Sequence, residues 1–322
     1  MKKVSICIPC YNEEENIENM YNVLKEEIKS ENDYDFEFVF ADNASKDSSR
    51  EVLSKLANED PSVKVIVNRR NYGPKRSNYN AFFRASGDVI ITMACDFQDP
   101  PAMIHELLRS WEKGNLVVFG QKTNSKENCM MHLIRSLYYK IIKYFSEVNH
   151  YEHVSSLFLM DREVVDVIKK IDDFEIDVHH LIEDLGYSVA LVPYTQEKRA
   201  KGKSSYNFIR YFDFAITELV NTSYLPLRIA TYLGSIMSFL SFLVGIVYFV
   251  YKLIFWDTFD AGSAPVVIGL FLLGSIQIMF LGIIGEYVGV ITKKLTKRPL
   301  VLEEETFNLE TNEEKRTSDK GM

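Results

Sequence analysis

Two apolar segments of this sequence end abruptly at acidic turns, and this pattern limits the fold more than any other feature. Residues 89–93 lead into the turn at 96–99, which contains Asp96, and residues 36–41 lead into Asp42. Short apolar runs that stop at such turns are typical of buried strands in a parallel sheet. Because parallel strands end at one sheet edge, we expect both acidic turns to lie there, where α/β enzymes bind nucleotides and metal ions.

Strand and helix patterns alternate along the N-terminal part of the chain. The patterns predict strands at residues 4–8, 36–40, 63–67, 89–93 and 116–119. They predict helices at residues 14–29, 48–58, 75–85 and 101–111. Such a βαβ succession indicates an α/β domain with a mainly parallel sheet. No repeat or low-complexity linker divides this region, so we expect one domain.

Two long runs without Asp, Glu, Lys or Arg follow, at residues 229–251 and 261–285. Each exceeds the roughly 20 residues that a helix needs to cross a bilayer. We therefore predict two transmembrane helices. The alternative is a pair of buried core helices, which rarely stay uncharged on all sides for this length.

Basic residues flank the two runs and predict their orientation. Arg228 precedes the first run, and Lys293, Lys294, Lys297 and Arg298 follow the second. The positive-inside rule then predicts both termini in the cytoplasm and a multi-pass protein of the cell membrane. No signal peptide is expected, because residues 4–10 lead straight into acidic residues and not into a cleavage site.

The four cysteines do not form the pattern of a disulfide scaffold. Cys7 and Cys10 have redox spacing, but they close a predicted strand where a redox motif would open a helix. No second pair completes a zinc site. We therefore expect no thiol or zinc chemistry at these positions.

Several motifs follow one another in order, at residues 4–14, 42, 70–73, 86–88, 96–101, 199–206, 285–289 and 298–300. Together they resemble family 2 glycosyltransferases, in the branch that acts on polyprenyl phosphates. That branch is similar to dolichol-phosphate mannose synthase and bactoprenol glucosyltransferases. The resemblance covers nearly the whole chain, and any one motif alone would be weak evidence.

The resemblance implies a GT-A, Rossmann-like nucleotide-diphospho-sugar transferase domain. It implies transfer of a sugar from a nucleotide sugar, with a UDP-sugar expected, to a polyprenyl phosphate, giving a lipid-linked sugar for cell-envelope glycan modification. A divalent cation, Mg²⁺ or Mn²⁺, would neutralise the diphosphate. The expected partners are these two substrates and the bilayer, with no nucleic acid, and the chain is a candidate homo-oligomer.

Site residues follow from the same resemblance. Asp96 and Gln98 are the predicted metal ligands. Asp96, Arg199 and Ser156 are the predicted catalytic residues. The nucleotide-sugar site is predicted to contain Pro9, Tyr11, Glu13, Asp42 and Asp96. The acceptor phosphate is predicted to meet Arg199, Lys201, Lys203 and Ser204, for which a basic patch that attracts anionic lipid is the alternative.

The chain departs from the family pattern at three places around this site. Ala94 stands where members usually carry the first Asp of Asp-x-Asp, and Asn43 and Ala44 replace an Asp-Gly pair. Residues 155–158 align with a segment that usually contains Asp and Arg. Nearby histidines, His153, His179 and His180, are candidates for replacement contacts. A non-catalytic relative that retains nucleotide binding and membrane anchoring is therefore the alternative to an enzyme.

The predicted domain organisation has four parts. A cytosolic glycosyltransferase domain covers residues 1–203, and an amphipathic helix at 204–225 lies on the membrane surface or packs as an ordinary helix. The transmembrane hairpin covers residues 226–292. The charged tail at 293–322 is expected to be cytosolic and largely disordered. Two spans are too few for a polymer channel, which disfavours a processive synthase, or for a transporter.

Overall fold

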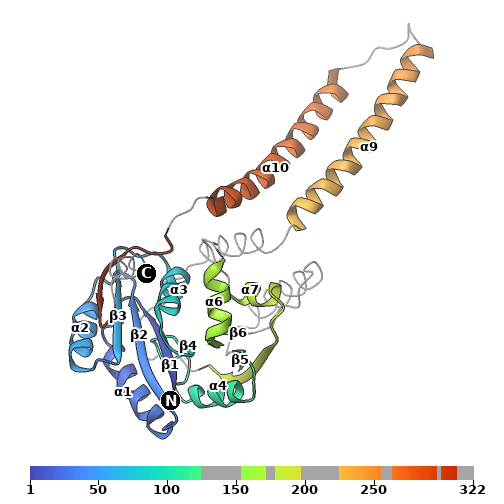
Figure 1. The fold of residues 1–322 in the computed structure, drawn as a ribbon. Helices are drawn as coiled ribbons and strands as arrows, with labels where there is room; N and C mark the ends of the chain where they lie inside the picture. The colour runs from blue at the N-terminus through green and yellow to red at the C-terminus, as the bar shows by residue number, and fades with distance from the viewer. Residues whose placement is uncertain (125–153, 172–177, 197–224, 255–262, 296–298, 310–322) are drawn as a thin grey trace, which may run out of the picture. The chain divides into compact units, whose positions relative to one another are not determined.

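The computed structural model describes residues 1–124, 154–171, 178–196, 225–254, 263–295 and 299–309 (Figure 1). The chain divides into two compact units, described separately here. Unit 1 contains residues 1–204 and 297–322, and unit 2 contains residues 205–296. The C-terminal segment therefore belongs to the same unit as the N-terminal domain.

Unit 1 is built on an eight-stranded sheet with the order β7-β5-β6-β4-β1-β2-β3-β8. Strands β1 to β4 are parallel to one another, and β5 is parallel to β7. Strands β6 and β8 run antiparallel to their neighbours. The strands are β1 Lys2–Cys10, β2 Tyr34–Asp42, β3 Val63–Asn68, β4 Val89–Thr92, β5 Val117–Asn124, β6 Val154–Asp161, β7 Val189–Thr195 and β8 Glu303–Phe307. The predicted α/β class and mainly parallel sheet are confirmed.

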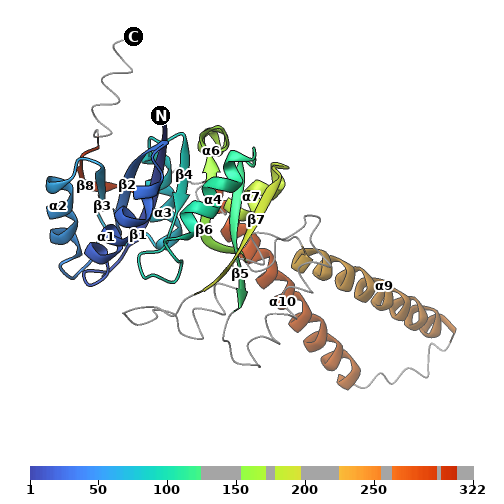
Figure 2. The same ribbon diagram turned by 90° about the horizontal axis from the view of Figure 1, so that it is seen from below.

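Helices cover both faces of this sheet (Figures 1 and 2). One apolar core lies against α1, α2 and α4, and the other lies against α3, α6 and α7. Side chains alternate between the two cores along each strand, so that Ile6 and Cys7 of β1 face opposite sides. The helices of unit 1 are α1 Ile17–Glu27, α2 Ser49–Glu59, α3 Pro74–Arg84, α4 Met103–Glu112, α6 Arg162–Lys170 and α7 Val178–Asp184.

Element boundaries differ from the sequence predictions where local hydrogen bonds intervene. Helix α1 begins at Ile17 and not at residue 14, because residues 13–16 form a turn in which the Asn16 N–H donates to the Glu13 carbonyl at 2.9 Å. Strand β5 extends to Asn124, beyond the predicted residue 119, because its whole length pairs with β7.

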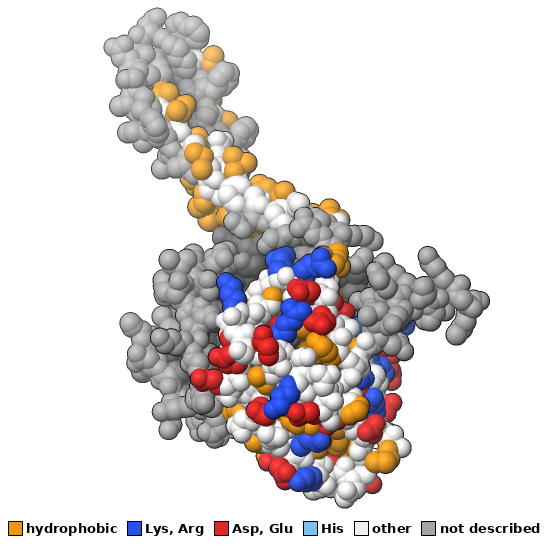
Figure 3. Space-filling model, turned by 90° about the vertical axis from the view of Figure 1, so that its left-hand side faces the viewer, with side chains coloured by type: hydrophobic (Ala, Val, Ile, Leu, Met, Phe, Trp, Pro, Cys, Tyr) orange, Lys and Arg blue, Asp and Glu red, His pale blue; other side chains and the backbone are white. Residues whose placement is uncertain are grey.

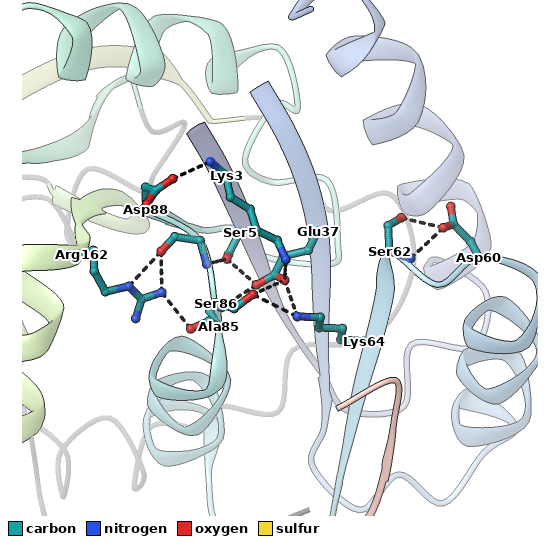
Figure 4. A network of polar contacts seen from close by, with 11 residues as sticks. Lys3, Ser5, Glu37, Asp60, Ser62, Lys64, Ala85, Ser86, Asp88 and Arg162 are labelled. Atoms are coloured by element: carbon teal, nitrogen blue, oxygen red, sulfur yellow. Dashed lines mark hydrogen bonds and ion pairs between the residues drawn. The ribbon is translucent and has the colours of Figure 1, made fainter. Parts of the chain in front are cut away.

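A buried carboxylate ties three strands together at the turn before β4 (Figure 4). The side chain of Glu37 on β2 accepts hydrogen bonds from Ser5 Oγ and from both the N–H and Oγ of Ser86, each at 2.6 Å. The ammonium groups of Lys3 and Lys64 also pair with it. Burial opposes the charged form, but these donors outweigh that effect and lower the pKa of Glu37 to about 2.

Gly87 in the same turn leaves no room for a side chain. A Cβ atom built there would lie 2.6 Å from Ser5 Oγ and 2.8 Å from the Lys3 carbonyl oxygen. The Arg162 guanidinium donates to the carbonyls of Ala85 and Gly87, at 2.8 Å and 2.9 Å respectively (Figure 4). The Ser86-Gly87-Asp88 motif is therefore a structural turn at the start of β4.

The C-terminal strand β8 corrects part of one sequence prediction. Residues 293–322 were expected to be largely disordered, yet residues 303–307 pair with β3 as an edge strand. The strand forms because its acidic side chains meet basic partners, and Phe307 packs against the core. Acidic and basic side chains are interspersed over the face of unit 1 that Figure 3 presents. Residues 310–322 lie outside the described residues.

Unit 2 contains two helices, α9 Leu225–Ile254 and α10 Ser263–Leu295. They run antiparallel beside each other (Figures 1 and 2). A Cβ at Gly234 on α9 would lie 3.1 Å from the Phe280 ring on α10, so this glycine allows close approach. Of the residues that the structure describes, no helix combines the length and the apolar character required to cross a membrane.

Candidate active site

The ends of four parallel strands form the edge at which the predicted site residues meet. Cys10, the last residue of β1, is in register with Asp42, the last residue of β2. Asp42 is in turn in register with Val67 near the end of β3, and Cys7 is in register with Thr92 at the end of β4. Both acidic turns therefore leave the sheet at its carboxyl edge, as the sequence pattern predicted.

Asp42 is almost fully buried, with 1% of its surface exposed. Its carboxylate accepts hydrogen bonds from the N–H of Ser45, at 3.2 and 3.3 Å, and from the Ser45 hydroxyl. Burial raises the pKa of Asp42, although the bonds from Ser45 oppose that shift. Ala44, where the family pattern has glycine, adopts a left-handed φ of 59°. The turn keeps the conformation that glycine favours even though the glycine is absent.

The loop that contains Tyr11 and Glu13 is fastened to the loop after Asp42. The N–H of Asn12 donates to Ser45 Oγ at 2.9 Å, and the Lys46 N–H donates to Asn12 Oδ1 at 2.8 Å. The side chains of Pro9, Tyr11 and Glu13 are half-buried. Pro9 and Asp42 therefore lie near the ends of β1 and β2, and Tyr11 and Glu13 lie in the loop after β1, which hydrogen bonds join to the loop after β2.

Asn43 links the same edge to β3, a role that sequence reasoning missed. Its Nδ2 donates to Asn71 Oδ1 at 3.1 Å, and its Oδ1 accepts from the Tyr72 N–H at 2.9 Å and from Asn68 Nδ2 at 3.2 Å. The amide does what a carboxylate at this position could not, since it both donates and accepts. Asn43, where the family pattern has Asp, therefore makes a link that includes a donated hydrogen bond.

The second acidic turn, at residues 96–99, places Asp96 and Gln98 at the end of β4. Asp96 is 5% exposed, and its Oδ1 accepts from the N–H of Gln98 at 3.2 Å. Between these residues Phe97 has a left-handed φ of 59°, which is rare for a bulky side chain. The turn is thus strained while it presents two oxygen-bearing side chains.

Asp99 and Tyr194 form a buried pair that the sequence did not reveal. The Tyr194 hydroxyl donates to Asp99 Oδ1 at 2.6 Å, and the Ala94 N–H donates to Asp99 Oδ2 at 3.4 Å. Burial raises the pKa of both Asp99 and Tyr194. The two residues are far apart in the sequence, and only the pairing of β5 with β7 brings Tyr194 to this edge.

The residue predicted as catalytic on β6, Ser156, lies beside the end of β4. Its carbonyl accepts from Thr92 Oγ1 at 2.6 Å, and its side chain is exposed. His179 does not extend into open space there. Its Nε2 lies 3.1 Å from the Ser155 carbonyl oxygen, and its ring lies 4.7 Å from that of Phe119.

Several predicted residues cannot be placed. Arg199, Lys201, Lys203 and Ser204 lie outside the described residues, as do His153 and most of the predicted amphipathic helix at 204–225.

The cysteines of the described region, Cys7, Cys10 and Cys95, are buried and free. Burial raises the pKa of Cys7, which keeps that thiol in its unreactive form.

The two predicted metal ligands fit a cation that is shared with a substrate. Among the described residues no cluster of three or more His, Cys, Asp or Glu side chains could hold a metal by itself. One carboxylate, on Asp96, and one amide oxygen, on Gln98, are the donors present. Mg²⁺ is commonly held by one or two carboxylates together with phosphate oxygens and water. The donor set therefore suits a cation that arrives with a diphosphate.

Comparison with known proteins identifies the family. Residues 5–169 match the model of glycosyl transferase family 2, and residues 225–291 match the GtrB C-terminal hairpin. An uncharacterized glycosyltransferase of Synechocystis is 30% identical over 309 residues, which cover 96% of each chain. A prophage-derived bactoprenol glucosyl transferase of Shigella flexneri is 29% identical over 92% of this chain and 96% of its own.

Among solved structures, a mannosyltransferase of Pyrobaculum calidifontis is similar at 18% identity with a TM-score of 0.46, over 68% of this chain and 62% of its own. That likeness is too distant to carry an argument about ligands. The sequence matches are sufficient for the class: this chain belongs to glycosyl transferase family 2. It is a glycosyltransferase with a catalytic domain followed by the hairpin found in GtrB proteins.

Proposed function

We propose that this glycosyltransferase moves a sugar from a UDP-sugar to a polyprenyl phosphate. The observation that carries the proposal is the common carboxyl edge of the sheet. At this edge the buried Asp42 ends β2, and the buried Asp96 follows β4. Relatives of nearly the same length are named bactoprenol glucosyl transferases, and bactoprenol is a polyprenyl alcohol. The lipid-linked sugar would serve modification of cell-envelope glycans.

The nucleotide sugar would bind across the loops after β1 and β2, which hydrogen bonds join to each other. Asp42 would receive donors of the base or ribose, and Pro9, Tyr11 and Glu13 would line the pocket. Asp96 and Gln98 would hold Mg²⁺ or Mn²⁺ against the diphosphate. When bound, the cation supplies positive charge that stabilises the departing nucleoside diphosphate. The nearly buried carboxylate of Asp96 is suited to this because low solvent exposure strengthens its attraction for a cation.

The acceptor phosphate is already an anion, so it needs positioning more than deprotonation. One phosphate oxygen would form a bond to the anomeric carbon as the bond from that carbon to the diphosphate oxygen breaks. Arg199, Lys201, Lys203 and Ser204 offer charge-assisted donors that would hold the phosphate for this attack. Ser156 would contribute from the exposed end of β6. No strong base is required, which is consistent with the absence of the acceptor-side Asp from residues 155–158.

The hairpin of unit 2 would hold the enzyme in the cell membrane as a multi-pass protein, with the catalytic domain and both termini in the cytoplasm. Large apolar side chains support this proposal, because Leu270 and Ile278 on α10 are 68% and 71% exposed. Figure 3 shows hydrophobic side chains over much of the described part of the hairpin. The basic residues that flank the two helices support the orientation.

Transfer can be tested directly with membranes that contain the full chain. They would be incubated with a panel of labelled nucleotide sugars and undecaprenyl phosphate, and the chloroform-soluble product would be measured. We expect product from a UDP-sugar, which chelator should abolish. A wild type that is inactive over a broad donor panel, where a related enzyme is active, would contradict the proposal.

A second candidate function, nucleotide binding without transfer, is favoured by the three departures at Asn43, Ala94 and residues 155–158. Under this alternative the purified protein binds a nucleotide, yet no combination of sugar and lipid phosphate yields product. Introduction of Asp at position 94 and position 156 would then create activity. In the enzyme that we propose, the same two substitutions are not required for turnover.

A further inference from the structure

The strained turn that carries Asp96 and Gln98 requires partners that keep it in place. Phe97 adopts a left-handed backbone conformation, and such residues persist only where surrounding contacts over-determine them. Within the turn, the Gln98 N–H donates to Asp96 at 3.2 Å and the Ala94 N–H donates to Asp99 at 3.4 Å. Both hydrogen bonds are long, so contacts from other elements add to the stability of the turn.

Tyr194 near the end of β7 and Gln196, one residue beyond it, supply such contacts. The Tyr194 hydroxyl donates to Asp99 at 2.6 Å, and Gln196 Nε2 donates to Gln98 Oε1 at 3.1 Å. Asp99 is 2% exposed and Tyr194 is 5% exposed, so their hydrogen bond is shielded from water. A bond to a charged group in such surroundings is stronger than an exposed one.

The position of the Tyr194 ring is itself fixed by close packing. A Cβ at Gly120 on β5 would lie 3.1 Å from the ring, so glycine is what allows the ring to lie there. The Tyr194 carbonyl accepts from Thr123 Oγ1 at 3.0 Å, which fastens the backbone of β7 to β5. The hydroxyl is therefore presented to Asp99 from a rigid element.

We propose that Tyr194 and Gln196 are positioning residues that hold the cation-binding turn at residues 96–99 in its strained conformation. The inference rests on the proposed function, because it assigns these two residues a role at the turn where the cation and the donor diphosphate would bind. Tyr194 and Gln196 act through Asp99 and Gln98 and do not themselves contact the reacting atoms.

The test compares Tyr194→Phe with Tyr34→Phe in the full-length protein. Tyr34 makes the same kind of bond, to a Glu112 carboxylate oxygen at 2.6 Å, but at the start of β2, away from the carboxyl edge. Both variants lose only a hydroxyl group. The melting temperature in chelator reports the structural loss, and calorimetric titration with UDP and Mn²⁺ reports the site without any turnover.

We expect Tyr194→Phe to weaken Mn²⁺-dependent UDP binding about five- to ten-fold. The exchange of amide hydrogens at residues 94–99 should become faster in the absence of metal. Tyr34→Phe should change neither of these two quantities. Gln196→Leu should weaken UDP binding in the same direction and leave the melting temperature unchanged.

Two results would overturn the inference, and they are distinguishable. If the wild type binds UDP with Mn²⁺, and Tyr194→Phe binds UDP equally well with unchanged amide exchange at residues 94–99, the positioning role is wrong while the proposed function stands. If the wild type binds no nucleotide and forms no product, the proposed function fails and this inference fails with it.

Discussion

Single side chains at the carboxyl edge of the sheet determine what this site can bind. Asp96 is the only carboxylate that the sequence retains from the Asp-x-Asp pattern, since Ala94 replaces the first. A site with one carboxylate and one amide ligand binds a cation weakly unless a substrate phosphate completes it. The proposed cation site would therefore depend on Asp96 more than a site with two carboxylates would.

We predict that Asp96→Asn abolishes sugar transfer and weakens Mn²⁺-dependent UDP binding at least ten-fold. A loss of about 1.4 kcal/mol in binding free energy corresponds to that factor. Calorimetry and the transfer assay would measure the two effects. Asp166→Asn, on the exposed side of α6, is the matched control, and full activity of Asp96→Asn in excess chelator would refute the metal assignment.

Glu37 contributes to the free energy of unfolding and not to ligand binding. Its folded-state pKa of about 2 lies below the ordinary value of 4.5. Because the pKa of this carboxylate is lower in the folded state, its ionised form stabilises the folded state when the pH is above the ordinary pKa. This contribution is lost as the pH falls from about 4.5 towards 2. The shift corresponds to on the order of 3 kcal/mol.

We therefore predict that Glu37→Gln lowers the free energy of unfolding at pH 7 by about 3 kcal/mol. The variant should also lose part of the fall in stability between pH 4.5 and pH 2. Thermal melts across this pH range would measure both effects. Glu112→Gln, which changes a solvent-exposed ion pair, should have little effect. Equal behaviour of the two variants would contradict the role of the buried network.

At the scale of elements, β8 shows how a charged segment becomes part of a sheet. Glu303 pairs with Arg84 and accepts from Asn80 Nδ2 at 3.0 Å, and the Glu303 and Arg84 side chains are 10% and 8% exposed. Glu304 pairs with Arg50, but both side chains are more than 40% exposed. Asn308 Nδ2 donates to the carbonyls of Ala57 and Val63 at 2.7 and 2.8 Å, which fixes the end of the strand.

We predict that Glu303→Ala loosens β8, because it leaves the buried guanidinium of Arg84 without this carboxylate, at a cost of about 3 kcal/mol. Glu304→Ala should cost less than about 1 kcal/mol, as exposed pairs usually do. Amide hydrogen exchange along β3 should become faster only in the first variant. The prediction fails if both variants leave β3 equally protected.

At the scale of the whole molecule, the chain leaves unit 1 once and returns to it. Unit 1 closes with residues 297–322, after the hairpin of unit 2. In that C-terminal part, β8 is hydrogen-bonded to β3 of the sheet. The hairpin is therefore connected to unit 1 at both of its ends. A hairpin in the membrane would then be connected to the catalytic unit by two segments of chain.

We predict that reporter fusions at residue 257 and at the C-terminus give opposite sidedness in the membrane. The reason is that Arg228, Lys293, Lys294, Lys297 and Arg298 lie on the chain-end sides of the two apolar runs, whereas the loop at 252–260 contains one Lys. This distribution should hold the chain ends on the cytoplasmic side. A pair of reporters, one active only in the cytoplasm and one only outside it, would measure this. The same sidedness for both fusions would refute the hairpin topology.

The sequence by itself determined the class of fold and the residues at two strand ends. Apolar runs that end at Asp42 and Asp96 specify buried parallel strands, since local pattern and burial agree there. The order of the motifs was enough to indicate the family. The periodicity of apolar residues also predicted the helix positions to within a few residues, because helix and strand periodicities are local properties of the chain.

Only the tertiary structure decided which distant residues meet. Tyr194 lies beside Asp99 because β7 pairs with β5, and no local pattern marks that contact. The acidic segment at 303–307 has the composition of a disordered tail, and it becomes a strand because Arg50 and Arg84 lie opposite it on unit 1. Charge and hydrogen-bond complementarity between remote segments is a property of the folded chain, so the sequence alone could not provide it.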